Sequence, residues 1–79
     1  MDVRALVEAS KRRRSLPNPA VARELRERAG ISQDELAYVV GVSGAAVSRW
    51  ESGKRTPTGR RLDRYVDVLA ALAQELTRP

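Results

Sequence analysis

The apolar residues of the chain recur at the spacing of an α-helix over most of its length. Val21, Leu25 and Ala29 lie four residues apart, and Gly30 then interrupts the run. Asn and Pro precede the run at positions 18–19. An Asn side chain accepts hydrogen bonds from the free N–H groups of a first helical turn, and a Pro in that turn leaves no N–H unpaired. The pattern predicts a helix from about residue 18 to residue 29.

A second, shorter helix is predicted immediately afterwards. Ser32 and Glu35 have the separation of a capping box, in which each side chain hydrogen-bonds the backbone N–H of the other residue. The helix then continues through Val40. Gly41 ends it, because glycine tolerates the left-handed backbone conformation at which many helices stop.

Two more helices follow along the chain. Ser43 is placed to cap a helix at about residues 44–52, and Gly53 closes that helix. Thr58 is placed to cap the last helix. The apolar positions of the last helix keep helical spacing almost to the end of the sequence: Leu62, Tyr65, Val66, Leu69, Leu72, Ala73 and Leu76.

The first residues carry a weaker helical signal. Val3, Leu6, Val7 and Ser10 form one modest stripe, and residues 15–17 separate it from the next helix. No segment alternates like a β-strand. We therefore expect an all-α, compact fold of four or five short helices in a single domain. Residues 1–17 form an N-terminal helix or basic arm, and residues 18–79 form the main body.

The charge balance favours a nucleic-acid partner. The 79 residues include 15 Lys and Arg and 10 Asp and Glu, which gives a net charge of +5. Among these cations only positions 11 and 54 are Lys, and the others are Arg. The Arg side chain presents a planar set of donors that suits phosphates and guanine edges. A GC-rich genome would give the same excess of Arg. The positions of the cations along the chain therefore have to distinguish a nucleic-acid partner from a bias in composition.

The composition also excludes several classes of function. The chain has no His and no Cys, which removes disulfides, thiol nucleophiles, imidazole bases and the usual zinc ligands. It has no phosphate-binding glycine loop, no set of aromatic residues for stacking on RNA, and no apolar run near the roughly 20 residues of a membrane span. We expect no enzyme, metal, cofactor, small-molecule ligand or membrane partner, and a cytoplasmic, nucleoid-associated location.

Residues 33–52 predict a steeply packed pair of helices. Gly41 lies in a turn too tight for an ordinary bundle loop, and Ala37 is small where the two helices would cross. The apolar residues of the pair face one another: Leu36, Ala37 and Val40 on the first helix, and Val42, Val47 and Trp50 on the turn and the second helix. This arrangement is typical of a helix-turn-helix. The outer face of the second helix carries small or hydrogen-bonding residues, as entry into a major groove requires: Gly44, Ala45, Ser48 and Arg49.

Three stretches together resemble the lambda repressor/Cro (XRE-type) helix-turn-helix family. They are LRERAGISQDELA at residues 25–37, GVS at 41–43 and VSRWESGKRTP at 47–57, and the resemblance extends over about residues 21–72. It implies that Gln33 holds a DNA phosphate and buttresses the recognition helix, and that Ser43 meets the DNA backbone. It also implies that Lys54 and Arg55 grip phosphate and that Glu51 makes a structural contact. The positions that read base edges are Gly44, Ala45, Ser48 and Arg49.

The sequence departs from this family at its first two reading positions. Gly44 and Ala45 replace the long polar residues that are often found there, and neither makes bidentate hydrogen bonds. Direct reading would then depend on Arg49, with Ser48 secondary. Shape readout or a minor-groove arm becomes more attractive, and the candidate arm residues are Lys11, Arg12, Arg13 and Arg14. The same four cations are equally typical of a solvated helix end.

These observations predict a sequence-specific regulator that binds double-stranded DNA. We expect a small Cro-like repressor, of phage or prophage type, that acts as a homodimer, with the C-terminal helix as a candidate interface. Two alternatives stay open: an antitoxin-like regulator that acts through a protein partner, and an architectural or excision-type DNA-bending protein. Arg60, Arg61 and Arg64 are each either a DNA-backbone contact or ordinary surface.

Overall fold

The described residues, 2–78 of the computed structural model, form five α-helices and no β-strand. The predicted all-α fold is therefore confirmed. The helices are α1 (Val3–Ser15), α2 (Pro19–Arg28), α3 (Gln33–Val40), α4 (Gly44–Glu51) and α5 (Gly59–Thr77). Within residues 2–78 no helix is both long enough and apolar enough to span a bilayer.

The predicted caps account for where the helices begin. Asn18 Oδ1 accepts from the Val21 N–H at 2.9 Å, and the Ser43 hydroxyl accepts from the Ala46 N–H at 3.2 Å. Both hydrogen bonds of the capping box between Ser32 and Glu35 are present, at 2.9 and 3.0 Å. Thr58 is the cap residue of α5, as predicted, but its side chain forms no capping hydrogen bond. α4 ends at Glu51, one residue before the predicted end.

The core lies where α3, α4 and α5 meet, and α2 covers it. Trp50 and Tyr65 pack against each other with ring centroids 4.8 Å apart. The buried apolar residues are Ala22, Leu36, Ala37, Val40, Val47, Trp50, Leu62, Tyr65 and Leu69. The predicted mutual packing of the two helix-turn-helix helices and the inward position of Trp50 are therefore confirmed.

The apolar face predicted for α2 is partly wrong. Val21 is 42% exposed, whereas Ala22 is buried, so the buried face lies one residue further along the helix. Arg26 is buried four residues after Ala22, and apolar periodicity cannot show a buried charge. The face of α2 is therefore set by an ion pair as well as by apolar packing.

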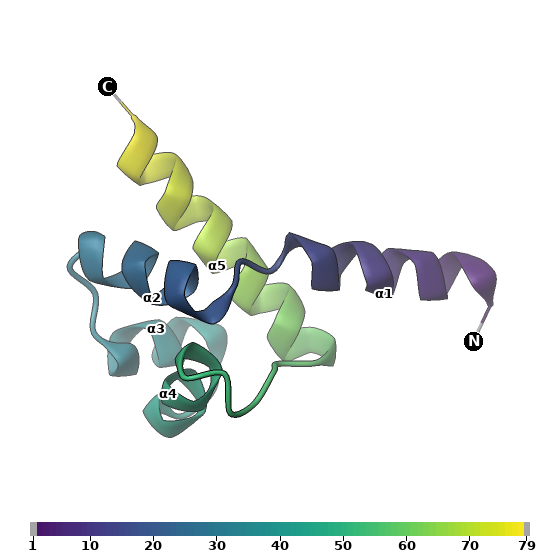
Figure 1. The fold of residues 1–79 in the computed structure, drawn as a ribbon, viewed down its shortest axis with the longest axis horizontal. Helices are drawn as coiled ribbons and strands as arrows, with labels where there is room; N and C mark the ends of the chain where they lie inside the picture. The colour runs from purple at the N-terminus through teal and green to yellow at the C-terminus, as the bar shows by residue number, and fades with distance from the viewer. Residues whose placement is uncertain (1, 79) are drawn as a thin grey trace.

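α1 extends away from the other helices. Figure 1 shows α2, α3 and α4 on one side of α5, whereas α1 extends away from the opposite side of α5. α1 contacts α5 and buries none of its residues. Arg12 Nε lies 3.0 Å from Asp63 Oδ1 on α5, but both side chains are about half exposed. Such exposed pairs contribute less than about 1 kcal/mol, so the attachment of α1 is weak.

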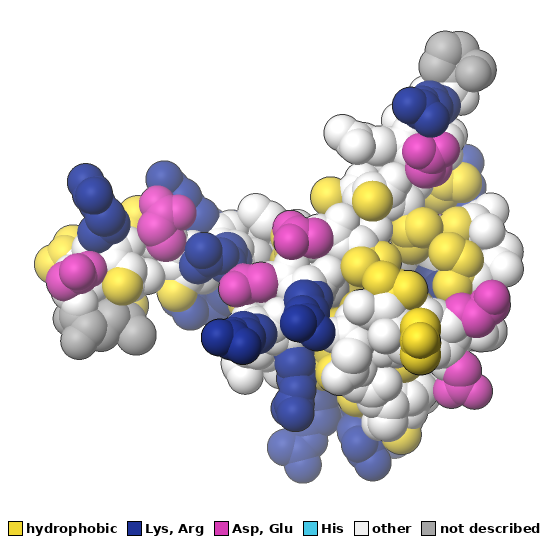
Figure 2. Space-filling view, turned by 180° about the vertical axis from the view of Figure 1, so that it is seen from behind, with side chains coloured by type: hydrophobic (Ala, Val, Ile, Leu, Met, Phe, Trp, Pro, Cys, Tyr) yellow, Lys and Arg dark blue, Asp and Glu magenta, His cyan; other side chains and the backbone are white. Residues whose placement is uncertain are grey.

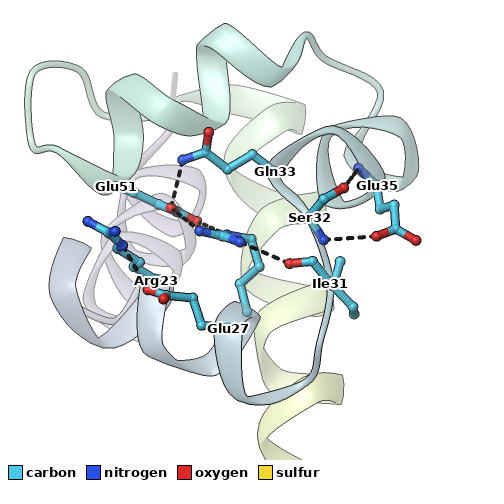
Figure 3. Close-up of polar contacts among 8 residues, drawn as sticks. Arg23, Glu27, Ile31, Ser32, Gln33, Glu35 and Glu51 are labelled. Atoms are coloured by element: carbon cyan, nitrogen blue, oxygen red, sulfur yellow. Dashed lines mark hydrogen bonds and ion pairs between the residues drawn. The ribbon is translucent and has the colours of Figure 1, made fainter.

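A buried ion pair fixes the far end of α4. Arg26 on α2 donates to both carboxylate oxygens of Glu51, at 2.7 and 3.0 Å, and its Nη1 donates to the Ile31 carbonyl at 2.9 Å. Gln33 Nε2, at the start of α3, donates to Glu51 Oε1 at 3.0 Å. Figure 3 shows these side chains converging from α2, α3 and α4. We call Arg26, Gln33 and Glu51 the polar clamp. Glu51 makes the structural contact that the family resemblance implies.

The clamp holds both charges in their ionised states. Burial alone would raise the pKa of Glu51, but the hydrogen bonds from Arg26 and Gln33 outweigh it, and the pKa lies below its usual value. The hydrogen bond to Glu51 raises the pKa of Arg26 despite burial. Burial raises the pKa of the nearby Tyr65 hydroxyl to about 12, and the negative charge of Glu51 adds to this shift. All three groups therefore keep one charge state throughout the neutral pH range.

Removing one member of the clamp is expected to cost far more stability than breaking an exposed ion pair does. Glu51→Ala should lower the free energy of unfolding by about 3–5 kcal/mol, because Arg26 would stay buried without its counter-charge. The matched control is Glu27→Ala, which breaks an exposed pair with Arg23 (2.7 Å) and should cost less than about 1 kcal/mol. Trp50 is the only Trp and lies in the core, so its fluorescence follows urea unfolding. Equal losses in the two variants would contradict this prediction.

Candidate nucleic-acid interface

The turn between α3 and α4 depends on a glycine. Gly41 has φ of 87°, in the left-handed region, and the N–H groups of Gly41 and Val42 both donate to the Ala37 carbonyl, at 2.8 and 2.9 Å. A Cβ on Gly41 would also lie 2.9 Å from Arg64 Nη1, which donates to the Val40 carbonyl at 3.5 Å. Arg64 therefore lies against the C-terminus of α3, where a cation interacts favourably with the helix dipole.

The outer face of α4 is open, and its longest side chain is Arg49. Ala45, Ser48 and Arg49 are exposed. The Arg49 guanidinium forms no hydrogen bond or ion pair with any residue from 2 to 78. Three of the four predicted base-reading residues therefore share one accessible surface, on which Arg49 has all its donors available.

Gly44, the fourth predicted base-reading residue, is different because it is only half exposed. A side chain at position 44 would run into the carboxylate of Asp34, whose Cγ lies 3.1 Å from the ideal Cβ position. The glycine thus leaves room for the Asp34 carboxylate between the start of α3 and the start of α4. Sequence reasoning did not identify Asp34, because spacing along the chain gives no measure of how closely two helices approach.

The two residues predicted at the helix starts are placed differently from each other. Ser43 is exposed at the start of α4, and its hydroxyl oxygen accepts the capping hydrogen bond. Gln33 is half-buried, and its amide N–H points to Glu51 in the polar clamp. Gln33 therefore contacts the last residue of α4 inside the protein, and the role in holding a DNA phosphate stays a prediction.

A basic groove of about 560 Å³ lies between α4, the loop after it and the first turn of α5. Arg49, Arg55 and Arg61 line it, and the other lining side chains are apolar or carry hydroxyl groups. The loop is held to α4 because the N–H groups of Lys54 and Arg55 donate to the Arg49 carbonyl, at 3.0 and 3.3 Å. Figure 2 shows Lys and Arg side chains gathered at this lower end of the domain.

Arg61 extends the predicted basic surface beyond the loop. The sequence left Arg61 open between backbone contact and ordinary surface, and the structure places it in the groove with Arg49 and Arg55. The available signal was its position in the first turn of α5, a few residues after the basic loop. The groove concentrates positive charge beside the open face of α4.

The four candidate arm residues lie on the last turns of α1, and none of them lines this groove. Lys11 Nζ is 3.6 Å from Glu8, and Arg12 pairs with Asp63. Arg13 lines a small cavity with Thr58, Gly59 and Leu62 at the base of α5. Arg12 and Arg13 therefore lie in the part of α1 that contacts α5.

No group of three or more metal-ligating side chains occurs within residues 2–78. Each feature of the interface is instead one that contacts DNA in other proteins: an open helix face, donors with no internal partner and a groove free of acids. The arrangement can present one helix to a groove and several arginines to the flanking phosphates.

Comparison with known proteins agrees with this geometry. Residues 23–76, more than half of the chain, match the family described as helix-turn-helix, and the match begins after α1. Searches among curated proteins and solved structures find no significant match. The family match and the α3–α4 geometry lead to one conclusion: the chain belongs to the lambda repressor/Cro-like (XRE-type) helix-turn-helix family of DNA-binding regulators.

Proposed function

We propose that the protein is a sequence-specific regulator of transcription that inserts α4 into the major groove of double-stranded DNA. The observation that carries this proposal is the unpaired Arg49 on the open face of α4, which continues into an acid-free groove lined by Arg55 and Arg61. A helix with small outer residues reaches base edges, while the flanking arginines neutralise phosphates. The protein acts without catalysis, metal or cofactor.

Each predicted contact residue has a distinct role in this proposal. Arg49 donates to O6 and N7 of a guanine, Ser48 adds a secondary hydrogen bond, and Ala45 contacts a thymine methyl group. Gly44 permits close approach at the start of α4. The groups that position the helix on phosphate are Gln33, Ser43, Lys54, Arg55 and, newly from its place in the groove, Arg61.

The regulator works as a homodimer in this proposal. Several apolar residues on α5 remain half-buried in the single chain: Val66, Val68, Leu72, Ala73 and Leu76. Figure 2 shows apolar side chains gathered beside the outer half of α5. Pairing through this face would present two copies of α4 to half-sites one helical turn, roughly 34–36 Å, apart. Occupancy of such a site would repress in the manner of a Cro-like protein.

The first test is selection of bound duplexes from a random DNA pool at about 150 mM salt. We expect an enriched inverted repeat bound by two chains, because each half-site would contact one copy of α4. The mass of the complex with the winning duplex gives the stoichiometry. Binding without enrichment that weakens steeply with salt would contradict specific regulation, and would favour DNA bending or a protein partner instead.

Arg49→Ala is expected to cost about 1–3 kcal/mol on the selected site and to relax the preference at one base position, because it removes a bidentate contact to guanine. The matched control is Arg78→Ala, which removes the same charge near the end of α5, far from α4 (Figure 1). Titration of each variant on the selected site and on random DNA measures both effects. A loss of equal size on both DNAs would show that Arg49 reads no base.

The basic run of α1 is proposed to follow phosphate or to enter an adjacent minor groove. Replacing Arg12, Arg13 and Arg14 with Ala should flatten the slope of log affinity against log salt by about 0.9 for each lost phosphate contact. The control replaces Arg23, Arg28 and Arg78 with Ala, which changes the net charge equally. An unchanged slope in the α1 variant, or equal changes in both variants, would rule out a specific role of the arm.

A further inference from the structure

The space beside Gly44 at the start of α4 is occupied by an acid from α3. Asp34 lies in the first turn of α3, and its Oδ1 takes the position into which a side chain on residue 44 would extend. The Asp34 Cγ is 3.1 Å from that ideal Cβ position, while its Cα is 3.7 Å away. The backbones are therefore far enough apart for a side chain, and it is the carboxylate that fills the space.

The Asp34 carboxylate is also available for a ligand. Asp34 is exposed, and within residues 2–78 it forms no hydrogen bond or ion pair. The other two acids of α3 and α4 are both held by partners: Glu35 by the capping box with Ser32, and Glu51 by the polar clamp. Asp34 thus differs from its neighbours in keeping its acceptors free.

The location of Asp34 determines what its carboxylate can meet. In α4, Gly44 lies one helical turn before Ser48, so the two residues border the same edge of the open face. The carboxylate beside Gly44 therefore lies at the margin of the surface that carries Ala45, Ser48 and Arg49. Placed against a major groove, this surface would present donors from Arg49 and an acceptor from Asp34.

We infer that Asp34 supplies the base-reading group that Gly44 lacks, and that it accepts a hydrogen bond from the N4 amino group of a cytosine. A carboxylate accepts hydrogen bonds and donates none, so it is matched by an exocyclic amino group. Cytosine is favoured over adenine because adenine places its N7 acceptor next to its amino group, where it would repel the carboxylate. This inference rests on the proposed function and names the chemistry that α3 contributes to it.

The negative charge of Asp34 also has an unfavourable effect on DNA binding, and this effect determines what its removal should do. A negative charge beside the DNA backbone weakens binding to every sequence, while one hydrogen bond to an amino group strengthens binding to the correct one. Removing the charge should therefore raise affinity for random DNA and lower discrimination. If Asp34 only repelled phosphate, removing its charge would raise affinity for all sequences alike.

The test compares selection from a random DNA pool by the full-length protein and two variants. Asp34→Asn keeps the shape of the side chain but removes its charge and puts an N–H donor beside the remaining acceptor, a pattern that matches adenine N6 and N7 in place of cytosine N4. Gly44→Ala keeps every charge but forces the carboxylate out of its position. Discrimination at one cytosine position, about tenfold in the parent protein, should fall below about threefold in both variants, while the guanine preference assigned to Arg49 is kept.

Asp67→Asn is the matched control, because Asp67 is an exposed acid on α5 with no hydrogen bond or ion pair within residues 2–78. It should leave the cytosine preference unchanged. Urea unfolding followed by Trp50 fluorescence checks that all variants fold. If Asp34→Asn strengthens binding to all sequences alike and the cytosine preference persists, the inference is wrong although the proposed function stands. A parent protein that enriches no sequence would overturn both.

Discussion

The buried ion pair between Arg26 and Glu51 is the contact on which the interface depends. Glu51 is the last residue of α4, and its carboxylate is the only group that receives donors from both α2 and α3 in the described part of the chain. An ion pair taken out of water gains little net free energy, but the loss of one partner leaves a buried charge that is costly. The pair therefore acts mainly by excluding other orientations of α4, because any rotation of the helix breaks three hydrogen bonds together.

A clamp of this kind suits α4, because this helix is too short to be stable by itself. α4 has only eight residues, and its outer face is too small and polar to pack against anything within the protein. Isolated helices of this length are unstable in water, so its geometry has to come from its buried side. Val47 and Trp50 pack against the core, and Glu51 fixes the orientation of the helix through its hydrogen bonds. The residues on the exposed face are therefore not needed to hold α4 in place, and they are free to contact DNA.

The sequence predicted the parts of this molecule that are local. Caps at Asn18, Ser32 and Ser43 and the turn at Gly41 follow from backbone chemistry within a few residues, and they were correct. The buried face of α2 was missed because Arg26 looks like surface until its partner 25 residues away is known. Asp34 was missed for a similar reason: it lies beside Gly44 because α3 packs against α4, and spacing along the chain does not report that packing. Arg61 was left open between DNA contact and ordinary surface, because its position shortly after the basic loop was visible but its place in the groove was not.

The small size of the reading surface has a consequence for specificity. A single bidentate contact discriminates by about 1–3 kcal/mol, whereas specific binding generally exceeds non-specific binding by about 4–10 kcal/mol. One copy of α4, with Arg49 as its only long donor, falls short of that range. In the proposed homodimer, two copies on a symmetric site would double the contribution, and the acceptor inferred on α3 would add a second base position to each half-site. Gly44 would then leave no gap in the base-reading surface, because it makes room for the Asp34 carboxylate of the neighbouring helix.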